Sequence, residues 1–386
     1  MKILVNCATL RVGGGLYAGV GFVREALTSD LGAQHEWAFI LSEPVYSQLK
    51  KLRLSFSGFQ TLVLDQFPSD WRHHFKIKRK MLAFERDTEP KIVYSIGAPS
   101  YINFRVSEVQ RLTNPWVTHP NLRAFFTLGF WEIPKTLLTV LIQRRFAARC
   151  EFFVTQTDTA KSGILRVTKG SPWKVKVITN RLSPLYENSA RESIKTDKKY
   201  IFCLAAPYRH KNLAIVPKVA LILRGLTAEK YCFILTIPFG HELESRIRSD
   251  IERLGVSDSV LNIGELDQQS CAEWYRMSTA VFLPTYLETF SVTLLEALYF
   301  DVPVITTDLS FNRDVLGETG LYFKPGQWKR AAEQLKVAIL RSRSGARSSA
   351  ISSADFFNKY GRYSDAFSET LNFLSFVNSR ESSSES

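Results

Sequence analysis

Short apolar segments rich in β-branched residues recur along the chain and alternate with longer amphipathic segments. Such segments, bounded by Pro, Gly and Asp, are typical of parallel strands that are buried on both faces. The predicted strands are residues 2–6, 37–41, 59–64, 92–95, 152–156, 174–178, 200–205, 232–237, 261–264, 280–283 and 302–306. Because helical segments lie between these strands, the pattern predicts an α/β protein built from βαβ units.

One of these βαβ units, residues 280–306, carries polar residues in unexpected places. Residues 291–300 are apolar on nearly all sides, which predicts a helix buried around most of its circumference. Glu296 lies in the middle of this helix, where an unpaired carboxylate would cost roughly several kcal/mol. Glu288 lies in the preceding loop, after the carboxyl end of a strand, where open α/β sheets bind ligands.

The start of the same helix predicts an anion site. The backbone amides of Phe290, Ser291 and Val292 have no partners inside the helix and lie at the positive end of its dipole. A carboxylate on either side of these amides suits a nucleotide sugar, which has hydroxyl groups at both ends and phosphate between them. The alternative is that Glu288 is an ordinary first-turn acid and Glu296 a core carboxylate paired with an arginine.

The spacing from Glu288 to Glu296 resembles the E-x7-E signature of retaining family-4 glycosyltransferases of the GT-B fold, and the turn at residues 317–325 resembles the one that usually follows it. The resemblance implies two Rossmann-like domains that face each other across a cleft. It also implies that Glu288 contacts the transferred sugar and that Glu296 holds the ribose hydroxyls. Thr289 and Ser291 stand where the family often has glycine, so the loop is bulkier and the donor sugar stays open.

The same resemblance points to further residues. Lys211 matches the lysine that binds the donor diphosphate, whereas Ala206 stands at the place of the family's arginine, so Arg209 is expected to supply that charge. A Gly-rich loop near the N-terminus faces the diphosphate in the family, which makes Gly14 and Gly15 candidates. His119 is the candidate for a histidine that reaches the donor sugar, with Asn114 as the alternative.

Charge and composition limit the partners. The chain has 386 residues, 45% hydrophobic and 23% charged, which is ordinary for a soluble protein of two α/β domains. A net charge of +13 favours an anionic partner: a phosphate-bearing substrate, an anionic lipid surface or nucleic acid. Nucleic acid is not expected, because the sequence has no zinc-finger spacing, RNA-recognition signature or Arg-rich arm. Five scattered cysteines indicate reduced thiols, and the apolar run in residues 1–10 is expected to be the first strand, at 2–6, rather than a signal peptide.

Residues 122–150 leave two alternatives open. Aromatic and aliphatic residues run into Arg144, Arg145 and Arg149, and Pro134 and Lys135 interrupt the apolar run, so a transmembrane helix is not predicted. The segment is either a core helix or an amphipathic element that rests on an anionic membrane.

We therefore predict a first, acceptor-binding domain over residues 1–183, joined by a crossing helix at about 360–378, and a donor domain over residues 184–359. Residues 342–354 are expected to be a connector and residues 379–386 a disordered tail. The predicted function is a retaining glycosyltransferase that moves a sugar, with mannose as one candidate, from a GDP- or UDP-sugar to a glycan or lipid-linked acceptor.

The resemblance places this function in cytoplasmic synthesis of bacterial surface polysaccharide, such as lipopolysaccharide or O-antigen, at or near the membrane. No cofactor and no metal are expected, since the sequence has no Asp-x-Asp pair. The alternatives are a catalytically silent sugar-binding protein at the membrane and a GT-B nucleotide-sugar epimerase.

Overall fold

The computed structural model describes residues 1–187, 189–343 and 353–382. The chain forms two compact units. Unit 1 consists of Met1–His119, Pro134–Thr179 and Ser364–Ser386, and unit 2 of Pro120–Ile133 and Asn180–Tyr363. The passage between the units at Thr179 and Asn180 lies close to the predicted domain end at residue 183.

Unit 1 contains a parallel sheet with the strand order β3-β2-β1-β4-β5-β6-β7 within the described residues. Its strands are β1 Lys2–Cys7, β2 Glu36–Ser42, β3 Gln60–Leu64, β4 Ile92–Ile96, β5 Glu108–Arg111, β6 Phe152–Thr155 and β7 Val175–Val177. Its helices are α1 Gly13–Thr28, η1 Gly32–Gln34, α2 Glu43–Lys51, α3 His74–Thr88, α4 Pro115–Thr118, most of α6 Glu132–Ala147, α7 Asp158–Thr168, η2 Pro172–Lys174 and α16 Tyr363–Ser382.

Unit 2 contains a second parallel sheet, with the order β10-β9-β8-β11-β12-β13 in the described part of the chain. Its strands are β8 Lys199–Cys203, β9 Tyr231–Leu235, β10 Val260–Asn262, β11 Ser278–Leu283, β12 Val304–Thr307 and β13 Leu321–Phe323. Its helices are α5 Leu122–Phe125, α8 Pro184–Glu187, η3 Arg209–Lys211, η4 Leu213–Ile215, α9 Val216–Arg224, α10 Glu242–Arg253, α11 Gln268–Met277, α12 Val292–Tyr299, α13 Ser310–Leu316, η5 Gly317–Thr319, α14 Trp328–Arg343 and α15 Ser353–Tyr360.

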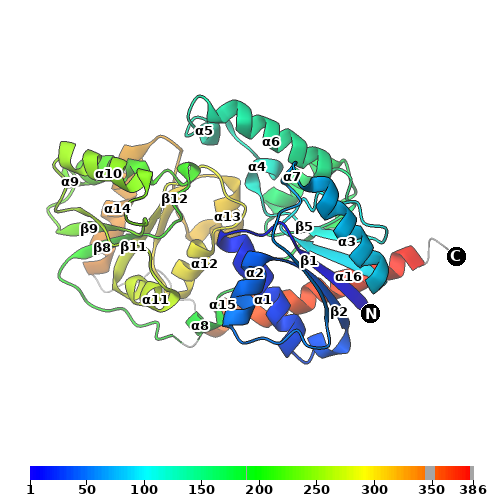
Figure 1. Cartoon of the computed structure of the whole chain (residues 1–386). Helices are drawn as coiled ribbons and strands as arrows, with labels where there is room; N and C mark the ends of the chain where they lie inside the picture. Colours follow the sequence, from blue (N-terminus) through cyan, green and yellow to red (C-terminus); the bar gives the residue numbers. More distant parts are fainter. Residues whose placement is uncertain (188, 344–352, 383–386) are drawn as a thin grey trace. The chain divides into compact units, whose positions relative to one another are not determined.

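Both sheets are covered by helices on both faces, as the apolar runs predict (Figure 1). Along β1, Ile3 and Val5 pack with α1, α2 and α16, whereas Leu4 packs on the opposite face with residues of α3. Successive side chains of a strand point to opposite faces, so a continuous apolar strand needs two helical layers.

The C-terminal helix α16 packs in the core of unit 1, where the crossing helix was expected. It contributes five buried apolar side chains: Phe367, Leu371, Phe373, Leu374 and Val377. The helix continues to Ser382, so the predicted disordered tail begins too early; the last four residues of that tail, 383–386, lie outside the described residues. The predicted connector at 342–354 lies mostly outside them as well, apart from the ends of α14 and α15.

Between β8 and α9 the chain forms the short turns η3 and η4, with Asn212 between them in a left-handed conformation with φ 56°. Two further predictions differ from the structure. Within the predicted turn at 317–325, Leu321–Phe323 forms β13, which pairs with β12. Pro120–Ile133 belongs to unit 2 rather than to the first domain, because it contacts the loops of unit 2 described below.

For residues 122–150 the sequence left open a core helix or an amphipathic surface element, and the structure decides between them for α6. Only Val140 and Ala147 of this helix are buried, so α6 is a surface helix rather than a core helix. No helix in residues 1–187, 189–343 or 353–382 combines the length and apolarity that crossing a membrane requires.

Leu374 provides a test of the role of α16. Its side chain is fully buried in unit 1, so Leu374→Ala removes methyl groups from a packed core and should destabilise the protein by about 2–5 kcal/mol in urea unfolding. The control Ser375→Ala alters an exposed neighbour on the same helix and should change stability by less than about 0.5 kcal/mol. Equal stability of the two variants would show that α16 does not contribute to the core.

Candidate active site

The strand order of unit 2 reverses between β8 and β11. From β8 the chain continues to β9 and β10 on one side of the sheet, and it then returns to β11 on the other side. The loops that leave the carboxyl ends of β8 and β11 therefore diverge and leave a crevice, which is where open α/β sheets bind ligands. Lys211 follows β8 and Glu288 follows β11, so the fold brings these two predicted residues to the same edge.

Lys211 and Glu288 form an ion pair between Nζ and Oε1. Only 15% of the lysine side chain and 13% of the glutamate side chain are exposed. Burial lowers the pKa of Lys211 to about 8, because the ammonium form loses hydration. The two predicted groups, one for the diphosphate and one for the sugar, thus lie in direct contact.

Several hydrogen bonds hold the two loops together. The Tyr286 amide donates to the His210 carbonyl at 2.8 Å, and the Thr285 hydroxyl donates to the same carbonyl at 3.3 Å. The Asn212 side chain donates to the Pro284 carbonyl at 3.4 Å. These bonds fix the backbone on both sides of the ion pair, so the position of Lys211 relative to Glu288 does not depend on that pair alone.

The predicted anion site lies at the start of α12. Ser291 is the N-cap residue, and its hydroxyl makes no capping hydrogen bond. The helix begins one residue later than predicted, so Phe290 and Ser291 precede it and Val292 is its first residue. The Thr293 hydroxyl donates to the Leu204 carbonyl at 3.2 Å, which ties the first turn of α12 to the chain that follows β8. The amides at this helix end point out of the helix, as an anion site needs.

Glu296 lies on α12 and is 7% exposed. Burial raises the pKa of Glu296 to about 7, and a hydrogen bond from the Tyr275 hydroxyl to Oε2 at 2.7 Å opposes this shift. The partner of this buried carboxylate is thus a tyrosine, whereas the structural alternative expected an arginine. Because Tyr275 occupies Oε2, Oε1 is the oxygen that could accept hydrogen bonds from ligand hydroxyls.

Arg209 pairs with other carboxylates than Glu288. Its guanidinium approaches Glu132 at 3.5 Å and Glu242 at 3.6 Å, and 41% of its side chain is exposed. The neighbouring His210 stacks on Tyr208 with ring centroids 5.5 Å apart, and burial followed by the charge of Lys211 lowers its pKa to about 4. His210 is therefore neutral at pH 7, and Arg209 would have to leave its two carboxylates to reach a phosphate.

The other predicted residues lie in unit 1. Gly14 and Gly15 are in the first turn of α1, after β1. A Cβ at Gly14 would meet nothing within 4 Å and one at Gly15 only a Leu10 methyl at 3.4 Å, so packing does not require glycine there. His119 Nδ1 lies 2.7 Å from the hydroxyl oxygen of Thr118. The alternative, Asn114, has a structural role, because it caps α4 through Oδ1 and donates from Nδ2 to Gln143 at 3.0 Å.

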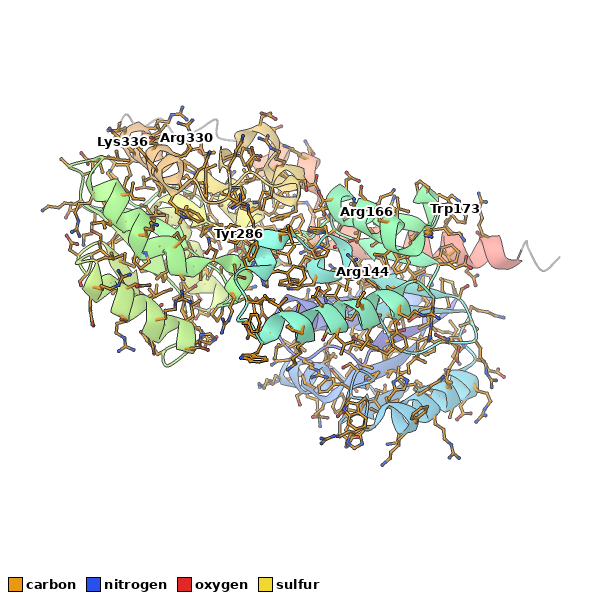
Figure 2. All side chains as sticks on the ribbon, turned by 90° about the horizontal axis from the view of Figure 1, so that it is seen from above. Arg144, Arg166, Trp173, Tyr286, Arg330 and Lys336 are labelled. Carbon is orange, nitrogen blue, oxygen red and sulfur yellow. The ribbon has the colours of Figure 1, made fainter. Side chains whose placement is uncertain are left out.

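Two features of the site could not be predicted from the sequence. Tyr275 carries no motif, although its helix pattern places it on the buried side of α11. Asn121 caps α5 and donates from Nδ2 to the Tyr286 carbonyl at 2.7 Å, so residues 120–133 contact the loop that leads to Glu288. Figure 2 labels Tyr286 at this position. Only the fold brings Asn121 to a loop so far away in the sequence.

Residues 186–353 match the family described as glycosyl transferases group 1, and this range includes Lys211, Glu288, Glu296 and the start of α12. The match falls within unit 2, the unit that holds these residues. The family prediction made from Glu288 and Glu296 is confirmed.

The chain is similar to two mannosyltransferases whose names refer to bacterial surface polysaccharides. It is 26% identical over 219 residues to the lipopolysaccharide core biosynthesis mannosyltransferase LpsB of Rhizobium meliloti, covering 53% of this chain and 60% of that protein. It is 24% identical over 236 residues to the O-antigen chain mannosyltransferase RfbU of Salmonella typhimurium, covering 60% of this chain and 64% of that protein. The chain thus matches under two thirds of the length of these relatives.

Solved glycosyltransferase structures share the fold over almost the whole chain. A glycosyltransferase from Rickettsia africae has a TM-score of 0.73 at 12% identity, covering 97% of this chain and 98% of that one. Anabaena Alr3699/HepE, solved with UDP and glucose, has a TM-score of 0.71 at 13% identity, covering 97% and 99%. These similarities establish the GT-B fold that the sequence predicts.

The pKa of Lys211 makes nucleotide binding depend on pH. Lys211 carries its charge below its pKa of about 8 and loses it above. Affinity for a nucleoside diphosphate should therefore fall as the pH rises from about 7 to about 9.5, where the diphosphate itself keeps its charge. Titration calorimetry at several pH values measures this. Lys211→Gln should bind more weakly and with little pH dependence, and a flat profile for the unaltered protein would contradict the assignment.

The pKa of Glu296 makes stability depend on pH. The unfolded glutamate loses its proton near 4.5 and the folded one near 7, so ionisation favours unfolding increasingly between these values. Glu296→Gln stays neutral, and its stability relative to the unaltered protein should rise by about 3 kcal/mol between about pH 4.5 and about pH 7. Urea unfolding across this range measures the difference. The exposed control Glu273→Gln should show no such rise, and a constant difference for Glu296→Gln would contradict the raised pKa.

Proposed function

We propose that this protein is a retaining glycosyltransferase that moves a sugar from a nucleoside diphosphate sugar to a glycan or lipid-linked acceptor. The observation that carries the proposal is the buried Lys211–Glu288 pair at the point where the strand order of unit 2 reverses. It lies inside the segment that matches the glycosyl transferases group 1 family. The start of α12 follows directly after Glu288 and offers amides to the same ligand.

Lys211 and the amides of Phe290, Ser291 and Val292 would stabilise the negative charge that develops on the leaving diphosphate. Such fixed donors act strongly because burial keeps water away from them. Glu288 would orient the transferred sugar and stabilise positive charge at its ring. Glu296 would accept hydrogen bonds from the ribose hydroxyls through Oε1, with Tyr275 holding the carboxylate in place.

In this reaction the bond between the anomeric carbon and the diphosphate oxygen breaks, and a bond to the acceptor oxygen forms on the same face of the sugar. The acceptor proton passes to the departing phosphate oxygen, so no dedicated base is needed. The roles that the resemblance implies for Gly14, Gly15 and His119, which lie in unit 1, stay predictions.

We also propose that the reaction needs no metal. The support is the absence of an Asp-x-Asp pair from the sequence and the presence of Lys211, Arg209 and the α12 amides as alternative positive groups. Among the described residues, no group of three or more His, Cys, Asp and Glu side chains is arranged to hold a metal ion.

The names of the relatives suggest the setting. Two of them are mannosyltransferases of lipopolysaccharide core and O-antigen chain, so we propose mannose as the transferred sugar and bacterial surface polysaccharide as the product. Such an enzyme would work at the cytoplasmic face of the membrane, where nucleotide sugars are available.

A donor-binding experiment tests the proposal. We expect one of UDP, GDP and ADP, with its sugar conjugates, to raise the melting temperature well above the other two, because only ligands that bind the folded state stabilise it. Glu296→Ala should weaken that nucleotide by roughly 10- to 100-fold, since hydrogen bonds to a charged acceptor are lost. Glu273→Ala, an exposed carboxylate of the same unit, is the matched control and should bind normally.

Turnover then separates an enzyme from a silent binding protein. With the donor that binds, transfer should retain the anomeric configuration of the sugar and persist in the presence of a chelator, and Glu288→Gln should lose transfer while it still binds nucleotide. Absence of any thermal shift at millimolar nucleotide would reject the donor site. Inversion of configuration or loss of activity with the chelator would reject the retaining or the metal-independent mechanism.

A further inference from the structure

The helix α6 carries four apolar side chains that are exposed. Leu137, Leu138, Leu141 and Ile142 are 45%, 60%, 63% and 44% exposed. Residues three or four apart lie on the same side of a helix, so these four form one outward surface, here called the α6 apolar face. An exposed apolar group of this size on a charged helix usually marks a site of interaction.

A pocket lies at the end of this face. It has a volume of about 480 Å³ and is lined by Thr118, Leu141, Arg144, Arg145, Arg166 and Val167, and is here called the arginine pocket. Figure 2 labels Arg144 on α6 and Arg166 on the neighbouring α7. Leu141 belongs to both the α6 apolar face and the arginine pocket, so the two are continuous.

The arginines of this pocket differ from most paired arginines of the chain in their surroundings. No ion pair of Arg144, Arg145 or Arg166 with a carboxylate occurs in the part of the chain that the structure describes. The Arg144 Nε donates to the Val117 carbonyl at 2.9 Å, which holds this guanidinium at the pocket wall. Burial, and then the charge of Arg166, lower the pKa of Arg144, so the cations repel one another. A bound anion would remove this repulsion.

We propose that the arginine pocket and the α6 apolar face together dock on a bilayer that contains anionic phospholipid. One lipid phosphate would occupy the pocket, and the leucine side chains would enter the boundary between headgroups and acyl chains. This partner matches both halves of the surface, since nucleic acid or free phosphate would satisfy the arginines but leave the leucines in water. The net charge of +13 adds a general attraction to such a surface.

The location of the pocket connects it with the proposed function, on which the choice of a lipid surface rests. Thr118 lines the pocket, and its hydroxyl oxygen lies 2.7 Å from Nδ1 of His119, the residue proposed to contact the sugar. Docking here would bring the α4 turn of unit 1 to the membrane, where a lipid-linked acceptor would be found.

Flotation of the full-length protein with vesicles tests the proposal. Phosphatidylcholine vesicles with phosphatidylglycerol should bind the protein, and pure phosphatidylcholine vesicles should bind it much more weakly. The variant Arg145→Gln/Arg166→Gln should lower binding roughly 25-fold, because each basic residue near an anionic surface contributes about fivefold. It leaves Arg144 and its hydrogen bond to Val117 in place, which protects the local fold.

Two matched controls use the helix α14 in unit 2. Arg330→Gln/Lys336→Gln also removes two positive charges, here from α14, and should leave vesicle binding within about twofold of the unaltered protein (Figure 2). Leu138→Gln/Leu141→Gln should weaken binding, whereas Val337→Gln/Leu340→Gln, at positions 36% and 43% exposed, should not. All four variants should keep their melting temperature and their nucleotide-induced shift, so failure of docking is distinct from failure of the donor site.

Equal binding to neutral and anionic vesicles would overturn the proposal, as would unchanged binding of Arg145→Gln/Arg166→Gln. Equal losses in Arg145→Gln/Arg166→Gln and Arg330→Gln/Lys336→Gln would attribute binding to net charge and would also overturn it. If the protein ignores vesicles but forms a dimer that Leu138→Gln/Leu141→Gln abolishes, the α6 apolar face binds a second copy and the bilayer is excluded.

Discussion

The candidate site depends on one constraint, the reversal of strand order between β8 and β11. This reversal brings Lys211 and Glu288 into contact although their loops are far apart in the sequence. Each charge is largely removed from water, and a single buried charge without its partner would be costly. The ion pair between Lys211 and Glu288 and the hydrogen bonds to the His210 carbonyl therefore stabilise one another. Helix α12 begins shortly after Glu288, at Val292.

Burial shifts three groups near the site toward their neutral forms. The pKa of Glu296 is raised, and those of Lys211 and His210 are lowered, with loss of hydration as the first cause in each case. The same low dielectric that makes these charges costly strengthens their attraction to a charged ligand. A diphosphate that enters would compete with Glu288 for Lys211. Donor binding would therefore replace the ion pair between Lys211 and Glu288 with one between Lys211 and the diphosphate.

The structure shows the contacts of Arg209, the residue expected to replace the family's arginine. Ala206 stands where an arginine is usual, and Arg209, expected to replace it, contacts Glu132 and Glu242. Glu132 lies in the segment 120–133, which belongs to unit 2, whereas the residues before and after this segment belong to unit 1. The segment also reaches the loop before Glu288 through Asn121. Helix α6 starts in this segment, and its later residues line the arginine pocket. One continuous stretch of chain thus contacts Arg209 in unit 2 and forms an exposed surface of unit 1.

The sequence by itself determined most strands, the α/β class and the identity of Glu288, Glu296 and Lys211 as candidates, because strand burial, helix starts and loop motifs are local patterns. Whether α6 is a core or a surface helix was decided only by the tertiary structure. So were the partner of Glu296, which is Tyr275, the partners of Arg209, and the transfer of residues 120–133 to unit 2. These features depend on contacts between segments distant in the chain, and a side chain's partner across such a distance leaves no periodic signal in the sequence around it.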